Sequence, residues 1–175
     1  MKKLSIVTLA LSITVFSATI SHADEWAKAY GGSDFDWTFS IQETTGGNYI
    51  TAGYTYSFGA GDSDAWVVKL NSDGTFSWQN SYGGSDYDWA YTIRETSDTG
   101  YIMAGYTESF GAGRADAWIL KLTSSGTVSW GKAYGDVDSD EVYSIQEITG
   151  GYIAAGRTSS FGDGDSDMWV LKLNN

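Results

Sequence analysis

The chain repeats itself with a period of 52 residues, and this period constrains the fold more than any other feature. The three copies begin at Trp26, Trp78 and Trp130. Residues 26–77 align without a gap on residues 78–129, and 31 of the 52 paired positions are identical. The third copy, 130–175, follows the same pattern with one residue fewer in a turn. A period of this length predicts a repeat architecture in which each copy is one supersecondary unit.

Each copy contains four short runs with the character of β-strands. In the first copy they cover residues 26–30, 38–44, 49–56 and 65–70. Apolar and polar side chains alternate in the second run, as in a half-buried strand, and the fourth run is apolar on both faces, as in a central strand. Segments rich in Gly, Asn and Asp separate the runs and favour tight turns. The sequence therefore predicts an antiparallel all-β fold with about four strands per repeat.

The first 23 residues have the composition of a secretory signal peptide. Two lysines precede an apolar stretch over residues 4–20, and small residues for signal peptidase end at Ala23. The apolar stretch is short for a membrane-spanning helix, and no later segment is apolar enough to span a membrane. We therefore expect a secreted chain, extracellular, periplasmic or on the cell surface, with one domain over residues 24–175.

Removal of this leader leaves an acidic chain with a restricted chemistry. The remaining residues include eight basic and 22 acidic side chains, so the net charge is −14 where the intact chain has −12. They include no His, Cys or Pro. The absence of His and Cys excludes Cys or Ser–His nucleophiles, disulfides and zinc sites with His or Cys ligands. The negative charge disfavours nucleic acid and anionic lipid as partners.

The order of motifs within each copy resembles a known repeat family. Tyr-Gly-Gly-Ser-Asp-x-Asp occurs at 30–36 and 82–88. In the first copy, Gly-Tyr-Thr-x-Ser-Phe-Gly-Ala-Gly follows at 53–61 and Asp-x-Trp-x-x-Lys-Leu at 64–70. This string resembles the β-propeller repeats of secreted and cell-surface proteins of bacteria and archaea, over nearly all of residues 26–174. The resemblance implies one four-stranded blade per period and an extracellular protein, without a defined activity.

The number of repeats raises the question of how such a fold is closed. Propellers typically have four to eight blades, whereas this chain has three repeats. The third copy ends before its final strand, and the run 26–30 at the other end is spare. We expect the spare strand to complete the third copy within one chain, between two chains, or from chain to chain in a filament. A β-prism and a β-trefoil also fit three repeats of four strands and remain alternatives.

Recurring tryptophans are candidates for both core and binding surface. Those within strands, such as Trp26 and Trp66, are expected in cores between sheets. Trp37 and Trp89 border loops, where they are candidates for sugar-stacking platforms.

Aspartates gather in the loops, where alternate carboxylates can serve as calcium ligands. The best local match is Asp163-Gly-Asp165-Ser-Asp167, although it lacks the glycine and the final glutamate of an EF-hand loop. The alternative is that Asp64, Asp116 and Asp167 cap turns by accepting backbone N–H bonds. Calcium is thus the one cofactor that the sequence suggests.

Two further kinds of charged residue recur once per copy. They are Lys69, Lys121 and Lys172 in an apolar strand, and Glu43, Glu95 and Glu147 in the second run. The lysines are expected to pack their stems and extend the ammonium to solvent or an Asp. Paired carboxylates hydrolyse glycosides, but these glutamates repeat with the fold and no single acid–base pair stands out.

The function that these patterns favour is a secreted, non-enzymatic interaction or assembly module. Its expected partners are another copy of the chain, in a dimer or a filament, or an extracellular glycan or protein. A lectin with repeated sites at Trp37 and Trp89 is the first alternative, and a glycosidase-like enzyme is the second.

Overall fold

The structure is a computed structural model that describes residues 5–8, 14–18 and 25–174, with side chains from residue 25 onward. Every regular element in these residues is a β-strand, so the all-β prediction is confirmed. The strands of the N-terminal half are β1 (Ser5–Thr8), β2 (Thr14–Ala18), β3 (Ala27–Ala29), β4 (Asp36–Thr44), β5 (Asn48–Thr55), β6 (Asp64–Leu70) and β7 (Phe76–Tyr82). The others are β8 (Asp88–Glu95), β9 (Tyr101–Thr107), β10 (Asp116–Leu122), β11 (Val128–Tyr134), β12 (Asp140–Ile148), β13 (Gly151–Thr158) and β14 (Asp167–Asn174).

The strands form four antiparallel sheets, each a meander of consecutive strands. We call β4–β7 the first sheet, β8–β11 the second and β12–β14 the third. A small sheet, β1-β2-β3, precedes them. The fourth predicted run is a central strand in the first two repeats, as expected: β6 lies between β5 and β7, β10 lies between β9 and β11, and all seven residues of each are buried. In the third repeat this run is the edge strand β14.

Sheet and repeat are offset by one strand. The strand that opens each repeat with a tryptophan pairs with the last strand of the repeat before it, so β7 completes the first sheet and β11 the second. The third sheet has three strands in the described residues, whereas the first and second sheets have four. This strand count agrees with the prediction that the last copy lacks its final strand.

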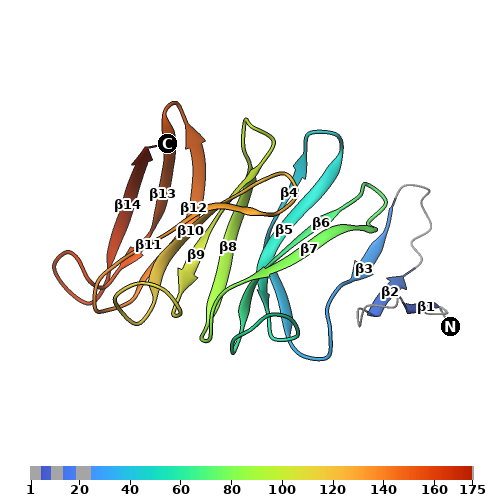
Figure 1. Ribbon diagram of the computed structural model, residues 1–175, viewed down its shortest axis with the longest axis horizontal. Helices are drawn as coiled ribbons and strands as arrows, with labels where there is room; N and C mark the ends of the chain where they lie inside the picture. The colour runs from blue at the N-terminus through green and yellow to red at the C-terminus, as the bar shows by residue number, and fades with distance from the viewer. Residues whose placement is uncertain (1–4, 9–13, 19–24, 175) are drawn as a thin grey trace.

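The three large sheets stack face to face in an open row (Figure 1). Side chains of β4, β5 and β6 pack on β8, and side chains of β8, β9 and β10 pack on β12. We call the contact between the first and second sheets the first joint and the contact between the second and third sheets the second joint. One apolar core fills each joint. The core lies between sheets, so each joint holds two repeats together.

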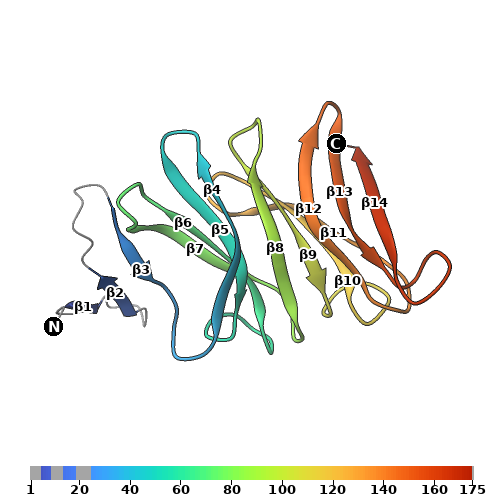
Figure 2. The same ribbon diagram turned by 180° about the vertical axis from the view of Figure 1, so that it is seen from behind.

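Closure within one chain, one of the three arrangements expected, is not observed. In both views β3 and β14 lie at opposite ends of the long axis (Figures 1 and 2), and β3 pairs with β2 instead. Three sheets are fewer than the four that the smallest propellers use to complete a ring. The third sheet therefore ends at β14 with no strand of the described residues beyond it.

The first strand of each of the three large sheets carries a β-bulge that the sequence pattern did not predict. The register of pairing shifts between Thr38 and Ser40 in β4, and at the equivalent positions of β8 and β12. A glycine on the neighbouring strand faces each bulge, and a Cβ on Gly53 would lie 1.8 Å from the carbonyl oxygen of Trp37. The recurring Gly-Tyr-Thr motif thus begins with a glycine because two backbones approach closely there.

The predicted leader, residues 1–23, lies largely outside the described residues, and its peptidase site lies entirely outside them. Only the strands β1 and β2 are described within it. No helix in the described residues is long and apolar enough to cross a membrane.

Candidate functional site

Two of the aspartates in the acidic loops, Asp64 and Asp116, cap turns in the same way. The Asp64 carboxylate accepts hydrogen bonds from the backbone N–H groups of Ala60 and Gly61 at 2.9 and 3.2 Å. Asp116 accepts the equivalent pair, both at 3.1 Å, from the backbone N–H groups of residues 112 and 113. The capping role predicted for these two aspartates is confirmed. Such bonds stabilise the loops that join neighbouring strands of one sheet, β5 to β6 and β9 to β10.

The predicted calcium loop is open and exposed. Asp163 and Asp165 face solvent, while Asp167 is half-buried at the start of β14. The Oδ2 atom of Asp167 has no hydrogen-bond partner in the described part of the chain. Within that same part, no three His, Cys, Asp or Glu side chains are placed to hold one metal ion.

The two tryptophans proposed as sugar platforms differ in environment. Trp37 is 54% exposed, on the face of the first sheet that no other large sheet covers. Trp89 lies in the first joint, where its ring stacks on Tyr54 with centroids 4.1 Å apart. Its Nε1 donates a hydrogen bond to Ser63 Oγ at 2.7 Å. Trp37 is therefore open to solvent, whereas Trp89 forms part of the contact between two sheets.

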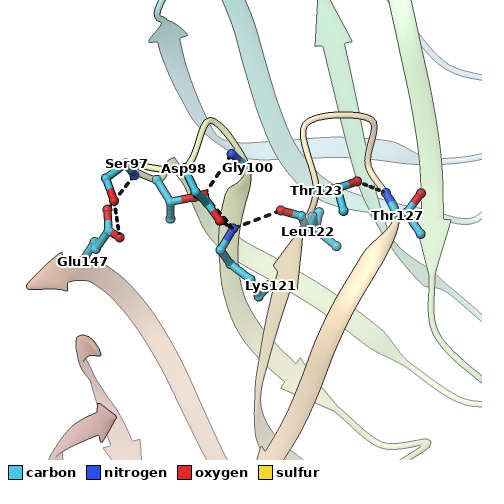
Figure 3. A network of polar contacts seen from close by, with 9 residues as sticks. Ser97, Asp98, Gly100, Lys121, Leu122, Thr123, Thr127 and Glu147 are labelled. Atoms are coloured by element: carbon cyan, nitrogen blue, oxygen red, sulfur yellow. Dashed lines mark hydrogen bonds and ion pairs between the residues drawn. The ribbon is translucent and has the colours of Figure 1, made fainter. Parts of the chain in front are cut away.

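Two of the repeated glutamates accept hydrogen bonds from the turn of the preceding sheet, an arrangement that we call the clasp. Glu95 accepts hydrogen bonds from the backbone N–H and the hydroxyl of Thr45, at 2.7 and 2.9 Å. Glu147 accepts the same pair of bonds from Ser97, at 2.7 and 2.8 Å (Figure 3). Glu43, the equivalent residue of the first sheet, is exposed and accepts no hydrogen bond from the described residues. The clasp is therefore complete at both joints and missing at the open end.

The repeated lysines behave in part as predicted. Lys121 is buried along its stem, and its ammonium lies 2.9 Å from the carboxylate of Asp98 (Figure 3). The Thr96 hydroxyl and this ammonium hold the pKa of Asp98 down at about 2. Lys69 is also buried, and its ammonium donates to Thr44 Oγ1 at 2.5 Å and lies 5.3 Å from the centre of the Tyr101 ring. Burial lowers the pKa of Lys69.

Aromatic rings form a ladder along the bulged edge of the row, which the sequence analysis missed. Phe39, Tyr91 and Tyr143 stand at equivalent bulge positions, and neighbouring centroids are 5.3 and 5.2 Å apart. In the third repeat, Glu141 and Arg157 form an ion pair at the positions where Trp37 and Tyr54 stand in the first. The alignment of the three copies contains a signal for this ion pair, because two facing aromatic residues are replaced by residues of opposite charge in one copy only.

The third sheet presents an open edge and an open face. Strands β6 and β10 are buried throughout, whereas β14, with nearly the same sequence, exposes every other residue from Met168 to Lys172. Met168 is 85% exposed and Val170 55%. These two apolar side chains and the unpaired edge of β14 form the largest departure of the third repeat from the other two.

Comparison with known proteins adds no further assignment. No protein-family model matches the chain, and no curated protein matches it either.

Proposed function

We propose that this chain is a secreted, non-enzymatic interaction and assembly module built of propeller-type blades. The observation that carries this proposal is the third sheet, which has three strands in the described residues where its two neighbours in the row of repeats have four. An edge strand offers unpaired N–H and C=O groups to which another strand adds. The working surface is therefore β14, and it binds a strand supplied by another molecule.

The strand that fits β14 has the pattern of β7 and β11. Each of these strands has a tryptophan and a tyrosine four residues apart. In β7, Trp78 meets Tyr101 edge-on at 5.9 Å and the Tyr82 hydroxyl donates to Gly126 O at 2.5 Å, and in β11 Trp130 meets Tyr152 edge-on, also at 5.9 Å. The strand before the first sheet carries the same pair, Trp26 and Tyr30.

This N-terminal strand makes the same contacts with the first sheet that β7 makes with the second. Trp26 meets Tyr49 edge-on at 6.0 Å, and the Tyr30 hydroxyl donates to Gly74 O at 2.7 Å, as in the second sheet. Its partner β2 belongs to the predicted leader, so removal of the leader leaves β3 without that partner.

The other functions considered receive less support from the same geometry. The stacking of Trp89 on Tyr54 leaves Trp37 as the one open platform of the two proposed for a lectin. Glu95 and Glu147 are engaged in structural bonds to Thr45 and Ser97, whereas a glycosidase needs two carboxylates that converge on one substrate.

The test uses the exported chain and a synthetic peptide with the sequence of residues 76–82. The protein is diluted until light scattering gives the mass of one chain, and hydrogen–deuterium exchange is followed at the β14 amides with and without peptide. We expect the peptide to slow exchange in β14, with β6 and β10 as internal references, and a scrambled peptide to have no effect. Unchanged exchange of β14 at millimolar peptide would refute the proposal.

A further inference from the structure

The apolar half of the joint between sheets uses the same four positions in each repeat. In the first sheet they are the buried residues Ile50, Ala52, Ala65 and Val67. In the second sheet they are Ile102, Ala104, Ala117 and Ile119, also buried. In the third sheet they are Ile153, Ala155, Met168 and Val170. These last four stay apolar although the described residues cover none of them fully, and an apolar face kept in this way is typical of an interface.

The polar half of the first joint consists of four side chains that bond to the next sheet. They are Ser40, Gln42, Thr45 and Ser63. The first two accept hydrogen bonds from the backbone N–H groups of Ile93 and Glu95, at 3.3 and 3.0 Å. The third donates to the Glu95 carboxylate, and the fourth accepts from the indole of Trp89. Two of the four bonds depend on side chains of the neighbour, the indole of Trp89 and the carboxylate of Glu95, and the other two go to backbone N–H groups. The set therefore fits a neighbour that has Trp and Glu at these two positions.

The third sheet carries the same four residue types. The second sheet has other types at all four positions and keeps the bonds to the next glutamate, from Ser97 to Glu147. The equivalent residues of the third sheet are Ser144, Gln146, Thr149 and Ser166. Those of the second sheet are Thr92, Arg94, Ser97 and Ala115. Ala115 stands opposite the repeat in which Glu141 replaces the tryptophan, so no indole N–H there needs a serine oxygen. The serine at position 166 thus matches a neighbour that does have the tryptophan.

The first sheet presents that neighbour's residues on its open face. Trp37, Ile41 and Glu43 occupy the positions of Trp89, Ile93 and Glu95, and all three are exposed, Ile41 at 61%. We call these three residues the head face, and the third-sheet residues of the preceding paragraphs the tail face. The charges of the two faces also match. Lys69 lies near Glu95 in the first joint, and the equivalent residues, Lys172 beside the tail face and Glu43 on the head face, are both exposed.

Resting on the proposed function, we infer that the partner of the tail face is the head face of a second copy of this chain. By equivalence with the first joint, Trp37 Nε1 donates to Ser166 Oγ and the Glu43 carboxylate accepts from Thr149. The strand β3 then lies along β14 as β7 lies along β6, with Trp26 opposite Lys172. The contact joins two different surfaces, so repetition closes a ring or extends a filament.

The experiment uses two exported variants, each with one blocked face. Trp37→Glu blocks the head face with a residue that the chain itself carries at the equivalent position 141, and Val170→Glu blocks the tail face at an exposed site. Light scattering is expected to give associated wild-type chains, monomers for each variant alone, and a one-to-one dimer when the variants are mixed. A dimer in the mixture also shows that both variants fold, because each variant must then offer one intact face. A third variant, Ser166→Ala, is expected to weaken association about tenfold, while Ser129→Ala on β11 leaves it unchanged.

Other outcomes separate this inference from the proposed function. Wild-type chains that stay monomeric to millimolar concentration overturn the head-to-tail partner, yet the peptide test can still find a strand bound at β14. A variant that self-associates like the wild type, or a mixture that remains monomeric while the wild type associates, overturns the assigned faces. A peptide that never binds β14, with association intact, refutes strand completion and leaves the face match standing.

Discussion

The Tyr54 ring lies parallel to the indole of Trp89, with an angle of 14° between the planes and 4.1 Å between centroids. This stack and the bond from the indole to Ser63 join the first sheet to the second at the bulged edge. The equivalent Trp37 has neither contact on its outer side among the residues that the structure describes. The same residue type thus supports the fold in one copy and faces solvent in another.

Trp89→Ala is expected to lower the free energy of unfolding by about 3 kcal/mol, since it removes a ring packed between two sheets. The matched variant Trp37→Ala should change it by less than about 1 kcal/mol, because that ring is mostly exposed. Guanidinium chloride denaturation at a concentration where the chain is monomeric measures both. Equal losses would mean that the stack contributes nothing specific.

Glu147→Ala is expected to free the turn that contains Ser97, since both hydrogen bonds to the carboxylate are lost. We expect a loss of about 1 kcal/mol in the free energy of unfolding and faster amide exchange at Ser97. Glu43→Ala is the control in the monomer, because this carboxylate holds no turn within the described residues. If Ser97 exchanges at the same rate with and without the Glu147 carboxylate, the clasp has no role.

Gly105→Ala is expected to cost about 3 kcal/mol or more, because the new Cβ would lie 1.8 Å from the carbonyl oxygen of Trp89 across the bulge. At Gly131 the nearest atom to such a Cβ is the end of the flexible Leu120 side chain. Gly131→Ala should therefore cost within about 1 kcal/mol. Thermal unfolding compares the two, and a larger shift for Gly131→Ala would contradict the bulge as the reason for this glycine.

Much of the architecture could be predicted from the sequence because repetition and strand periodicity act within short segments. The buried strand that contains Trp66 was recognised from six consecutive residues. The contact of Ser63 with Trp89 was missed, because it joins positions 26 residues apart and the serine lies in an acidic loop. The copies did contain the signal: serine faces tryptophan in one joint, and alanine faces Glu141 in the other. Chain closure could not be predicted, since it depends on the angle between sheets.

The ion pair of Asp98 with Lys121 predicts a dependence of stability on acid pH. The Thr96 hydroxyl and the Lys121 ammonium lower the pKa of Asp98 from 3.8 to about 2. The folded state therefore binds fewer protons than the unfolded state between these values, and the resulting stabilisation is complete above about pH 4 and lost as the pH falls through about 2. Because the Asp98 side chain is largely exposed, screening keeps the effect below about 1 kcal/mol.

Asp98→Asn tests this dependence against the wild type in urea denaturation at pH 5 and at pH 2.5. We expect the variant to be less stable at pH 5 and the difference to shrink at pH 2.5, where the wild-type carboxylate begins to take up its proton. Asp138→Asn serves as the control, because its carboxylate accepts no hydrogen bond from the described residues and lies in an exposed loop. The free energies of unfolding of the wild type and Asp98→Asn could instead differ by the same amount at both pH values. That result would show that the negative charge of Asp98 does not stabilise the turn and that the hydrogen bonds from Thr96 and Gly100 act without it.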